Sequence, residues 1–335
     1  MTGRARLFSV SALRARFAGV AAGDLSEMAL PAEAGLVARH LPRVLLRAAA
    51  AERRVSGVVA RPTGPPPGVT VIIPTRDRVD LLRKCIESLR RETAPFEAVI
   101  VDNGSIEDAT KAYFAGLAAD ARFSVLHRPG PFNFARLCNE AAGLSRMPAL
   151  LLLNNDVEAI EPGWLGELTA WTNDPTVGAV APKLLYPNRT VQHAGVVLGV
   201  EGVAGHFEYG LAADDPGYFG RLNAPYSSSA VTGACLAVRR DKFLAVGGLD
   251  EVNLPVELND IDFCLRLAER GWRSIVDGRL RLIHIESASR GRTCVVEEQY
   301  PREWSYFRRR WMHRLRNDPA FSPSLSLESN RAALP

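Results

Sequence analysis

The sequence lacks the features that would place it in a membrane or on nucleic acid. No apolar run among its 335 residues approaches the ~20 residues that a membrane-spanning helix needs. The formal net charge of +4 is small for this length, so nucleic acid is not an expected partner. Arg14 and Arg16 interrupt the apolar residues near the N-terminus, which argues against a signal peptide. We therefore expect a cytoplasmic globular protein.

Cysteine is also scarce. The five cysteines are scattered and form no C-x-x-C pair. Cys85 and Cys264 fall on the apolar faces of predicted helices, which indicates reduced packing residues in the protein interior. The remaining three are Cys138, Cys235 and Cys294.

Two kinds of phosphate-binding loop are missing after the first predicted strand. A dinucleotide-dependent oxidoreductase would carry G-x-G-x-x-G at this point, and a sugar-phosphate nucleotidyltransferase would carry a Gly-rich loop. The chain instead reads Pro74-Thr75-Arg76-Asp77. This absence argues against both classes of enzyme.

Proline and glycine divide the chain into segments. Residues 1–60 are Arg-rich with apolar residues at helical spacing, and they predict a helical accessory segment. The run RPTGPPPG at 61–68 cannot continue a helix and predicts a linker. We expect the main domain at 69–316 and a C-terminal tail at 317–335.

The main domain alternates apolar strands with amphipathic helices. Continuous apolar runs of four to six residues are typical of strands that are buried on both faces. The alternation predicts an α/β fold, with a mainly parallel Rossmann-like sheet and helices on both of its faces. The expected strands are 69–73, 97–101, 123–126, 149–153, 178–184, 191–198 and 231–238, and the clearest helices are 134–145 and 259–270. Asn259 or Asp260 is the expected N-cap of the last helix, and Gly271 its end.

Polar clusters follow three of the predicted strands. They are Pro74-Thr75-Arg76-Asp77, Asp102-Asn103-Gly104-Ser105 and Asn154-Asn155-Asp156. Ligands of open parallel sheets bind beyond the carboxyl ends of the strands, so three clusters at one edge indicate a binding cleft. The alternative is that all three are ordinary turn residues, because Asp, Asn and Gly favour turns.

Five motifs, in their order and spacing, resemble those of the family-2 glycosyltransferases of the GT-A fold. They are VTVIIPTRDRVDLLRKCIESL, VIVDNGS, LLLNNDVE, VTGACLAVRR and LNDIDFCLRLAERGW, and the resemblance covers about residues 69–290. The segments KLLYPNRTVQHAGVVLG, GVAGH and HIESASRG further resemble a bacterial, rhamnosyltransferase-like subgroup that builds O-antigen and other surface polysaccharides. The resemblance implies a nucleotide-sugar donor and a glycan or lipid-linked acceptor.

The resemblance also implies roles for residues at the strand ends. Pro74, Thr75, Asp77 and Asn155 would contact the donor nucleotide. Asp102 would accept a hydrogen bond from the imide nitrogen of uracil or thymine. Asp156, in the last position of the family's D-x-D-type motif, would bind the divalent metal, Mn²⁺ or Mg²⁺, that bridges the donor diphosphate.

Asp260 stands where the family keeps its catalytic base. An acceptor hydroxyl has a high pKa, so a positioned carboxylate is needed to take its proton during attack. Attack opposite the leaving group would invert the anomeric configuration in a single displacement. The alternative is structural, since an aspartate in a first helical turn meets the positive end of the helix dipole. That reading explains Asp262 and would also fit Asp260.

The metal motif departs from the family pattern. Asn154-Asn155-Asp156 supplies one carboxylate where the family often has two or three, so another protein ligand is expected. His284 is the candidate, because some relatives place a histidine there against the metal, and histidine suits manganese better than magnesium. A satisfied core histidine is the alternative. Where the subgroup commonly reads HHES, this chain reads His284-Ile285-Glu286-Ser287, so isoleucine replaces the second histidine.

Several further residues have open roles. Arg136 and Asn139 could reach the donor or could simply lie on the surface of a helix. Asn259 is another possible contact of the donor or the acceptor. His193 could lie near the acceptor or pack at an edge strand. The Gly- and aromatic-rich segment 199–229 could form a lid or a sugar-stacking surface.

A basic run, Arg308-Arg309-Arg310-Trp311, lies near the C-terminus and could contact anionic lipid headgroups at a membrane surface, or be a solvated face. Processive polysaccharide synthases carry Q-x-x-R-W, and Phe307 replaces its glutamine here. The pattern argues against a processive synthase.

Taken with the resemblance, these observations favour an inverting glycosyltransferase that uses dTDP-rhamnose or a UDP-sugar in surface-polysaccharide synthesis. The reduced metal motif leaves a catalytically weak or dead sugar-nucleotide-binding module as the alternative. A sugar-phosphate nucleotidyltransferase is favoured less, for the reason given above.

Overall fold

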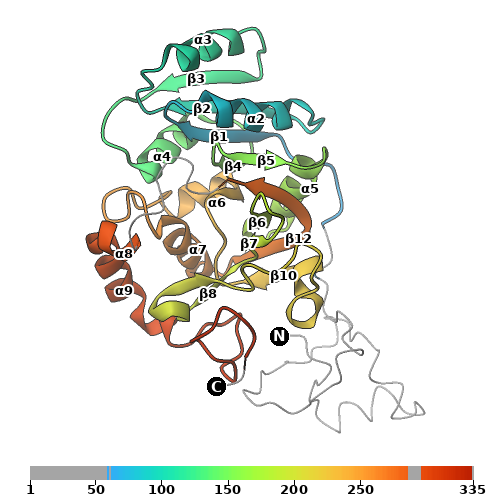
Figure 1. The fold of residues 1–335 in the computed structure, drawn as a ribbon, viewed down its shortest axis with the longest axis vertical. Helices are drawn as coiled ribbons and strands as arrows, with labels where there is room; N and C mark the ends of the chain where they lie inside the picture. The colour runs from blue at the N-terminus through green and yellow to red at the C-terminus, as the bar shows by residue number, and fades with distance from the viewer. Residues whose placement is uncertain (1–58, 60–61, 286–295, 334–335) are drawn as a thin grey trace, which may run out of the picture.

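A single twisted sheet runs through the molecule, as the computed structural model of residues 59, 62–285 and 296–333 shows (Figure 1). Its main path has the order β10-β12-β6-β11-β4-β1-β2-β3, with β5 paired to β12 and β7 paired to β6. The strands are β1 Val69–Thr75, β2 Phe96–Asp102, β3 Phe123–His127, β4 Ala149–Leu153, β5 Val157–Ala159, β6 Val177–Leu185, β7 Val191–His193, β10 Pro225–Ser228, β11 Cys235–Arg239 and β12 Arg273–His284.

The helices cover both faces of the sheet. They are α2 Val79–Arg90, α3 Asp108–Leu117, α4 Phe134–Leu144, α5 Trp164–Ala170, α6 Arg240–Ala245, α7 Asn259–Glu269, α8 Val296–Gln299 and α9 Pro301–Leu315. Alternate residues of a strand enter opposite cores: Ile73 of β1 belongs to the core that includes α2 and α5, whereas its neighbour Ile72 belongs to the core that includes α4, α7 and α9. The predicted α/β fold with a mainly parallel sheet and two helical layers is therefore confirmed.

Strands β4, β1, β2 and β3 form an all-parallel half of the sheet. The residues of β1 and β4 are almost continuously apolar and buried, as the sequence predicts for strands covered on both faces. In register, Thr75 at the end of β1 lies opposite Asp102 at the end of β2, so the polar residues after these strands share one edge.

The other half of the sheet is mixed. Strand β11 runs antiparallel to both β4 and β6, and β6 and β12 are parallel. The predicted strand 191–198 is wrong as one element: Gly195, at φ +89°, separates β7 from β8 (Val196–Leu198). Strand β8 leaves the main sheet and pairs with β9 (Ala204–His206) in a separate two-stranded sheet.

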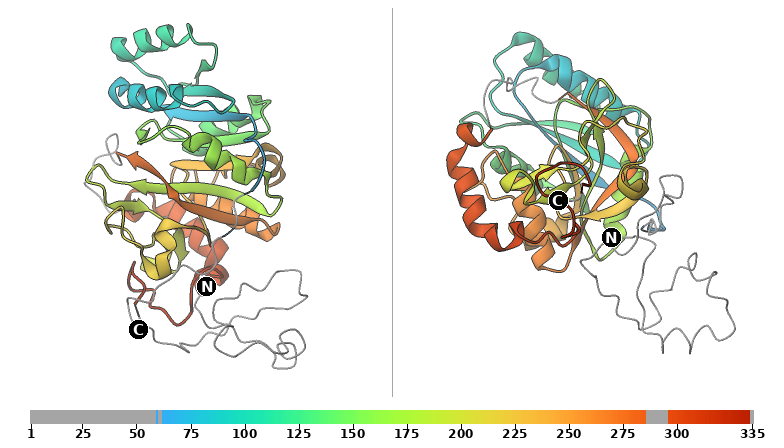
Figure 2. Two further views of the ribbon diagram at one scale, coloured as in Figure 1. Left: turned by 90° about the vertical axis from the view of Figure 1, so that its right-hand side faces the viewer. Right: turned by 60° about the horizontal axis from the view of Figure 1, so that its bottom comes forward.

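Residues 318–333 pack on that small sheet, as the views in Figures 1 and 2 show. Phe321 meets Phe207 with ring centroids 5.0 Å apart, and Asp318 accepts a hydrogen bond from the Leu198 N–H. The predicted linker also lies against the domain, where Pro66 lies beside Gly166 of α5. The predicted helical segment 1–60 falls outside the described residues, apart from Val59.

Four of the five cysteines lie within the described residues, and all four are buried free thiols, as predicted for Cys85 and Cys264. Cys294 falls outside those residues. Among the residues that the structure describes, no helix combines the length and apolarity needed to cross a bilayer.

Candidate active site

The ends of β1 and β4 are joined by side chains. The amide of Asn155 donates to the hydroxyl of Thr75 over 2.8 Å; Thr75 is the last residue of the buried strand β1, and Asn155 follows the buried strand β4. Pro74 is the preceding residue of β1 and is opposite Val101 of β2. The structure thus brings Pro74, Thr75 and Asn155 to the same edge, as the sequence predicts.

Asp77 joins the loops after β1 and β2. It has a positive φ of 52°, and its carboxylate Oδ1 accepts from the backbone N–H of Ile106 and Glu107 at 2.8 and 2.9 Å. Its own N–H donates to the hydroxyl of Ser105. These hydrogen bonds hold the two loops together at this edge of the sheet. Contact between Asp77 and the donor stays a prediction.

Asp102 is buried and doubly hydrogen-bonded. Its Oδ1 accepts from the Ser105 N–H at 2.8 Å, and its Oδ2 lies 2.9 Å from Nδ1 of His127. Burial opposes ionisation, but these hydrogen bonds hold the pKa of Asp102 below its ordinary value. His127 was not singled out from the sequence, although it ends the strand next to β2 in register with Asp102. The signal that the sequence offered was a polar residue at the end of the neighbouring parallel strand.

Asp156 and His284 meet as the sequence predicts. The Nε2 atom of His284 lies 3.2 Å from Oδ1 of Asp156, yet that oxygen has no hydrogen-bond partner among the described residues. Both side chains are more than nine-tenths buried. They approach because β12 pairs with β5, which follows directly after Asp156.

Gln192 sets the orientation of the His284 ring. The Oε1 atom of Gln192 lies 2.8 Å from Nδ1 of His284. An amide oxygen only accepts, so Nδ1 carries a proton, and a ring with this single proton presents the Nε2 lone pair toward Asp156. The amide of Asn154, 3.4 Å from Nε2, is consistent with an accepting nitrogen.

This arrangement fits a divalent cation. An unpartnered carboxylate oxygen and an imidazole lone pair 3.2 Å apart repel one another unless a cation or proton lies between them. Within the described residues, no group of three or more His, Cys, Asp or Glu side chains could hold a metal. Asp156 and His284 could therefore supply two of the ligands of such a cation.

Asp260 lies in the first turn of α7 and faces the loop before β11. Its Oδ2 accepts from the Gly233 N–H at 2.7 Å, and its Oδ1 accepts from the Ile261 N–H at 2.8 Å. The adjacent Ala234 carbonyl accepts from the Asn154 N–H at 2.9 Å. The loop at 233–234 therefore contacts both the candidate base and Asn154, which lies two residues before Asp156.

The predicted N-cap of α7 is wrong. Leu258 occupies the N-cap position in a left-handed conformation, φ 60° and ψ 5°, and it provides no side-chain cap. Asn259 and Asp260 lie inside the helix, so neither side chain caps its N-terminus. The amide of the buried Asn259 donates to the Val256 carbonyl at 2.8 Å. Gly271 follows the end of the helix at φ +81°, as predicted.

Arg136 and Asn139 make protein contacts on α4. Asn139 exchanges hydrogen bonds with the backbone of Leu249 and donates to the carboxylate of Glu251 at 2.8 Å. Arg136 lies 3.7 Å from Glu140, one helical turn away. Asn139 thus supports the loop leading toward α7, and contact of either residue with the donor stays a prediction.

His193 is fully buried and belongs to a pair. Its Nδ1 lies 2.8 Å from Nδ1 of His206, and its Nε2 accepts from the Gly195 and Thr232 N–H groups at 3.3 and 3.4 Å. Burial, together with His206 and His284 nearby, holds the pKa of His193 well below its ordinary value. A neutral His193 therefore links β7 to the loop that contacts Asp260.

An open cavity of about 370 Å³ lies at the β6–β7 turn. Its lining residues are Tyr186, Pro187, Asn188, Thr190, Tyr209 and Gly210. Tyr209 is 46% exposed and contributes an aromatic surface from the 199–229 segment, which the sequence suggested as a lid or sugar-stacking surface.

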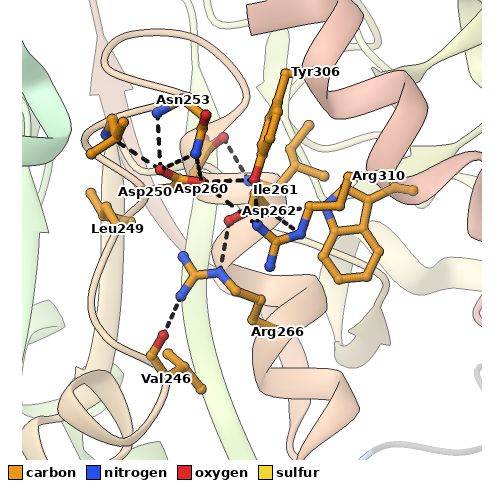
Figure 3. A network of polar contacts seen from close by, with 12 residues as sticks. Val246, Leu249, Asp250, Asn253, Asp260, Ile261, Asp262, Arg266, Tyr306 and Arg310 are labelled. Atoms are coloured by element: carbon orange, nitrogen blue, oxygen red, sulfur yellow. Dashed lines mark hydrogen bonds and ion pairs between the residues drawn. The ribbon is translucent and has the colours of Figure 1, made fainter.

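The basic run on α9 is partly turned inward. Arg310 and the buried Trp311 contact Asp262 of α7, as Figure 3 shows for Arg310. Arg308 pairs with Glu297 at 2.9 Å, and Arg309 is exposed. Arg310 and Trp311 thus serve the packing of two helices.

Comparison with known proteins identifies relatives of this chain. The family model described as glycosyl transferase family 2 matches residues 70–247. The chain is 44% identical over 269 residues to the uncharacterized protein y4gI of Sinorhizobium fredii, and 37% identical over 277 residues to the O-antigen biosynthesis protein RfbC of Myxococcus xanthus. It is 32% identical over 239 residues to a pre-mycofactocin glycosyltransferase of Mycobacterium tuberculosis. These matches cover 79%, 80% and 71% of this chain but 30%, 21% and 46% of the relatives.

Solved structures show the same fold at low sequence identity. A mannosyltransferase from Pyrobaculum calidifontis in complex with GDP-Man and Mn²⁺ superposes with a TM-score of 0.53 at 18% identity, covering 70% of this chain and 61% of that one. GalNAc-T7 with UDP, GalNAc and Mn²⁺ superposes with a TM-score of 0.59 at 14% identity, covering 75% and 50%. The fold is therefore that of the GT-A glycosyltransferases.

Proposed function

We propose that this chain, which belongs to glycosyl transferase family 2, transfers a sugar from a nucleotide-diphosphate donor to an acceptor hydroxyl with inversion of configuration. The observation that carries the proposal is the link between two candidate centres. Asp156 and His284 share a buried contact, and the loop at 233–234 is hydrogen-bonded both to Asp260 and to Asn154, two residues before Asp156.

Asp156 and His284 are proposed to hold a divalent cation against the donor diphosphate. A bound cation acts as a Lewis acid that stabilises the negative charge of the departing nucleotide diphosphate. The protein's own contribution is to exclude water from these two ligands and to fix the proton of His284 on Nδ1 through Gln192. Structures of the same fold contain Mn²⁺, which supports the choice of cation.

Asp260 is proposed as the general base. Its two carboxylate oxygens each accept one backbone N–H, so each keeps lone-pair capacity for an incoming hydroxyl. The hydroxyl oxygen would attack the anomeric carbon as its proton passes to Asp260, and the bond to the diphosphate would break on the opposite side. That single displacement inverts the anomeric centre.

The nucleotide is proposed to lie along the ends of β1 and β2. Because the pKa of Asp102 is below its ordinary value, its carboxylate stays ionised and can accept a hydrogen bond from the imide N–H of uracil or thymine. A dTDP-linked deoxysugar such as rhamnose or a UDP-sugar is therefore the proposed donor. Similarity to an O-antigen biosynthesis protein supports a glycan or lipid-linked acceptor in surface-polysaccharide synthesis.

A nucleotide-sugar screen tests this proposal. The full chain would be heated with dTDP-rhamnose, UDP-sugars and GDP-mannose, each with and without Mn²⁺, because a bound donor raises the melting temperature by mass action. Release of nucleotide diphosphate in the presence of acceptor extracts then measures transfer. We expect stabilisation by one uracil- or thymine-containing donor that is lost with a chelator.

Two variants separate binding from catalysis. Asp260→Asn should bind the donor normally and lose transfer by roughly 10²-fold or more, because it removes the general base. Asp156→Ala should lose metal-dependent donor stabilisation. Full activity of Asp260→Asn contradicts the base assignment, and a wild-type chain that binds donor without any transfer favours the binding-module alternative.

A further inference from the structure

Helix α9 lies outside the stretch that matches the family model, yet it packs along α7 (Figure 1). Phe307 and Trp311 are almost completely buried in the same core as the apolar face of α7. Glu303, Phe307, Arg310 and Trp311 recur at spacings of four, three and one residues, so they lie on one side of the helix. This face of α9 meets α7 and the loop before it.

Glu303 binds the loop immediately before α7. Its Oε2 atom accepts from the backbone N–H groups of Val256 and Glu257 at 2.9 and 2.7 Å. The Glu303 side chain is 6% exposed, so its carboxylate is largely withdrawn from water in order to make these two bonds. A buried acceptor shared by consecutive amides fixes the position of that peptide segment.

The next residue, Leu258, is in a conformation that side chains other than glycine rarely adopt. Its φ is 60°, in the left-handed region that a residue with a side chain enters only at an energetic cost. Such a conformation persists only when the surrounding structure imposes it. The hydrogen bonds that Val256 and Glu257 donate to Glu303 provide that restraint immediately before Leu258. Leu258 itself lies two residues before Asp260.

Asp262 anchors the opposite side of the same helical turn. Two residues correspond to about 200° around an α-helix, so Asp260 and Asp262 point in nearly opposite directions. The buried carboxylate of Asp262 accepts from the indole N–H of Trp311 at 2.9 Å and from Arg266 at 2.7 Å. Arg310 adds an ion pair at 3.4 Å, and Figure 3 shows Asp262 between the two arginines.

We propose that α9 positions the general base: Glu303 and Trp311 hold the first turn of α7 so that Asp260 faces the Gly233 loop. The inference rests on the proposed function of Asp260. Neither Glu303 nor Trp311 contacts Asp260 directly, so both are positioning residues. Their loss should misplace the carboxylate without disturbing Asp156, His284 or the nucleotide edge.

Steady-state kinetics of the full chain, with the donor found in the screen, test this role. Glu303→Ala and Trp311→Phe should each lower kcat about tenfold, equivalent to ~1.4 kcal/mol of barrier, and leave the donor KM within about twofold. Met312→Ala is the matched control, because Met312 is on the same helix and 54% exposed. It should leave both constants unchanged.

Two further measurements separate positioning from general loss of structure. Glu303→Gln keeps a side-chain oxygen that accepts from the two amides, so it should recover most of the kcat that Glu303→Ala loses. Hydrogen–deuterium exchange should show faster exchange at Val256 and Glu257 in Glu303→Ala, with the amides of β1 and β4 still protected. Wild-type kcat in Glu303→Ala, despite faster exchange, overturns the positioning role.

Failure of the proposed function looks different. A wild-type chain that transfers no sugar from any donor overturns the function itself. An active wild-type chain with fully active Glu303→Ala and Trp311→Phe overturns only the inference about α9. A parallel fall in melting temperature and donor affinity in both variants, without rescue by Glu303→Gln, also overturns it and marks α9 as a purely structural helix.

Discussion

At the scale of single residues, the candidate metal site includes the neutral amide of Gln192 beside its two candidate ligands. Gln192 carries no charge, but its oxygen determines which nitrogen of His284 holds the proton. Asp102 and His127 show a similar dependence, since the hydrogen bond between them helps to keep Asp102 ionised. In both pairs the partner sits on a different strand.

Replacing Gln192 should weaken cation binding. In Gln192→Leu the Nδ1 proton of His284 loses its acceptor, and loss of such a partner typically lowers metal affinity by roughly 10–100-fold. Titration of Mn²⁺ in the donor-dependent thermal shift measures the effect. Gln299→Leu, at an exposed glutamine of α8, is the control. Equal Mn²⁺ affinity in both variants contradicts a role for His284 as a ligand.

The sequence singled out the candidate site residues, but not the contacts that hold them in place. Asp156 and His284 stood out because a polar residue ends an apolar run, or interrupts one, at a recognisable motif. The contacts of Gln192 with His284 and of His127 with Asp102 were not predicted, because they follow from strand register across 92 and 25 residues of chain. Register between distant strands is a tertiary property that local patterns do not encode.

At the scale of elements, the irregular 199–229 segment is fastened to the sheet through a buried lysine. Lys183 of β6 donates to the carbonyls of Ala213 and Leu222 at 2.9 and 2.8 Å and lies 3.3 Å from Asn223 Oδ1. Burial, with the nearby Arg281, lowers the pKa of Lys183 to about 8. The folded protein therefore releases this proton at lower pH than the unfolded chain does.

Stability should consequently depend on pH through Lys183. Between about pH 8 and the ordinary lysine value of 10.5, unfolding takes up a proton. Wild-type stability relative to Lys183→Met should therefore rise with pH in this window, by up to ~1.4 kcal/mol per pH unit, and be flat below it. Urea unfolding of both proteins across pH 7 to 10.5 measures the slope. Lys111→Met, on the exposed side of α3, controls for the change in net charge.

Long apolar runs made the strands and helices of the parallel half predictable, whereas the elements around Gly195 were not. A positive φ at Gly195 breaks an otherwise continuous β pattern, because the chain must leave one sheet and enter another. The N-cap of α7 was missed for a related reason. Leu258 has low preference for its left-handed conformation, and the chain just before it is hydrogen-bonded to Glu303 of a distant helix.

At the scale of the whole molecule, residues beyond α9 belong to the same folded body as the sheet. Asp318 is buried and accepts from the Leu198 N–H and the Ser229 hydroxyl, each at 2.6 Å. Burial raises the pKa of Asp318 despite these bonds. The segment 318–333 thus closes the side of the molecule that carries β8 and β9.

Removal of the Asp318 carboxylate should destabilise the fold. Asp318→Ala leaves the Leu198 amide and the Ser229 hydroxyl without their acceptor, and each buried unsatisfied group costs ~1–3 kcal/mol. Chemical denaturation should therefore show a loss of at least ~1 kcal/mol. Glu328→Ala, at an exposed position of the same segment, should change stability by less than ~0.5 kcal/mol. Equal stability of the two variants would show that the segment is only loosely attached.

The family match ends at residue 247, before the candidate base, the candidate metal ligand His284 and α9. This division has a consequence for exchanging parts between homologues. A chimera joined near residue 247 would pair the donor edge of one parent with the base and its supporting helix from the other. Such a hybrid should keep its nucleotide preference and inherit the turnover number of the C-terminal parent, provided that α7 and α9 are inherited as one block.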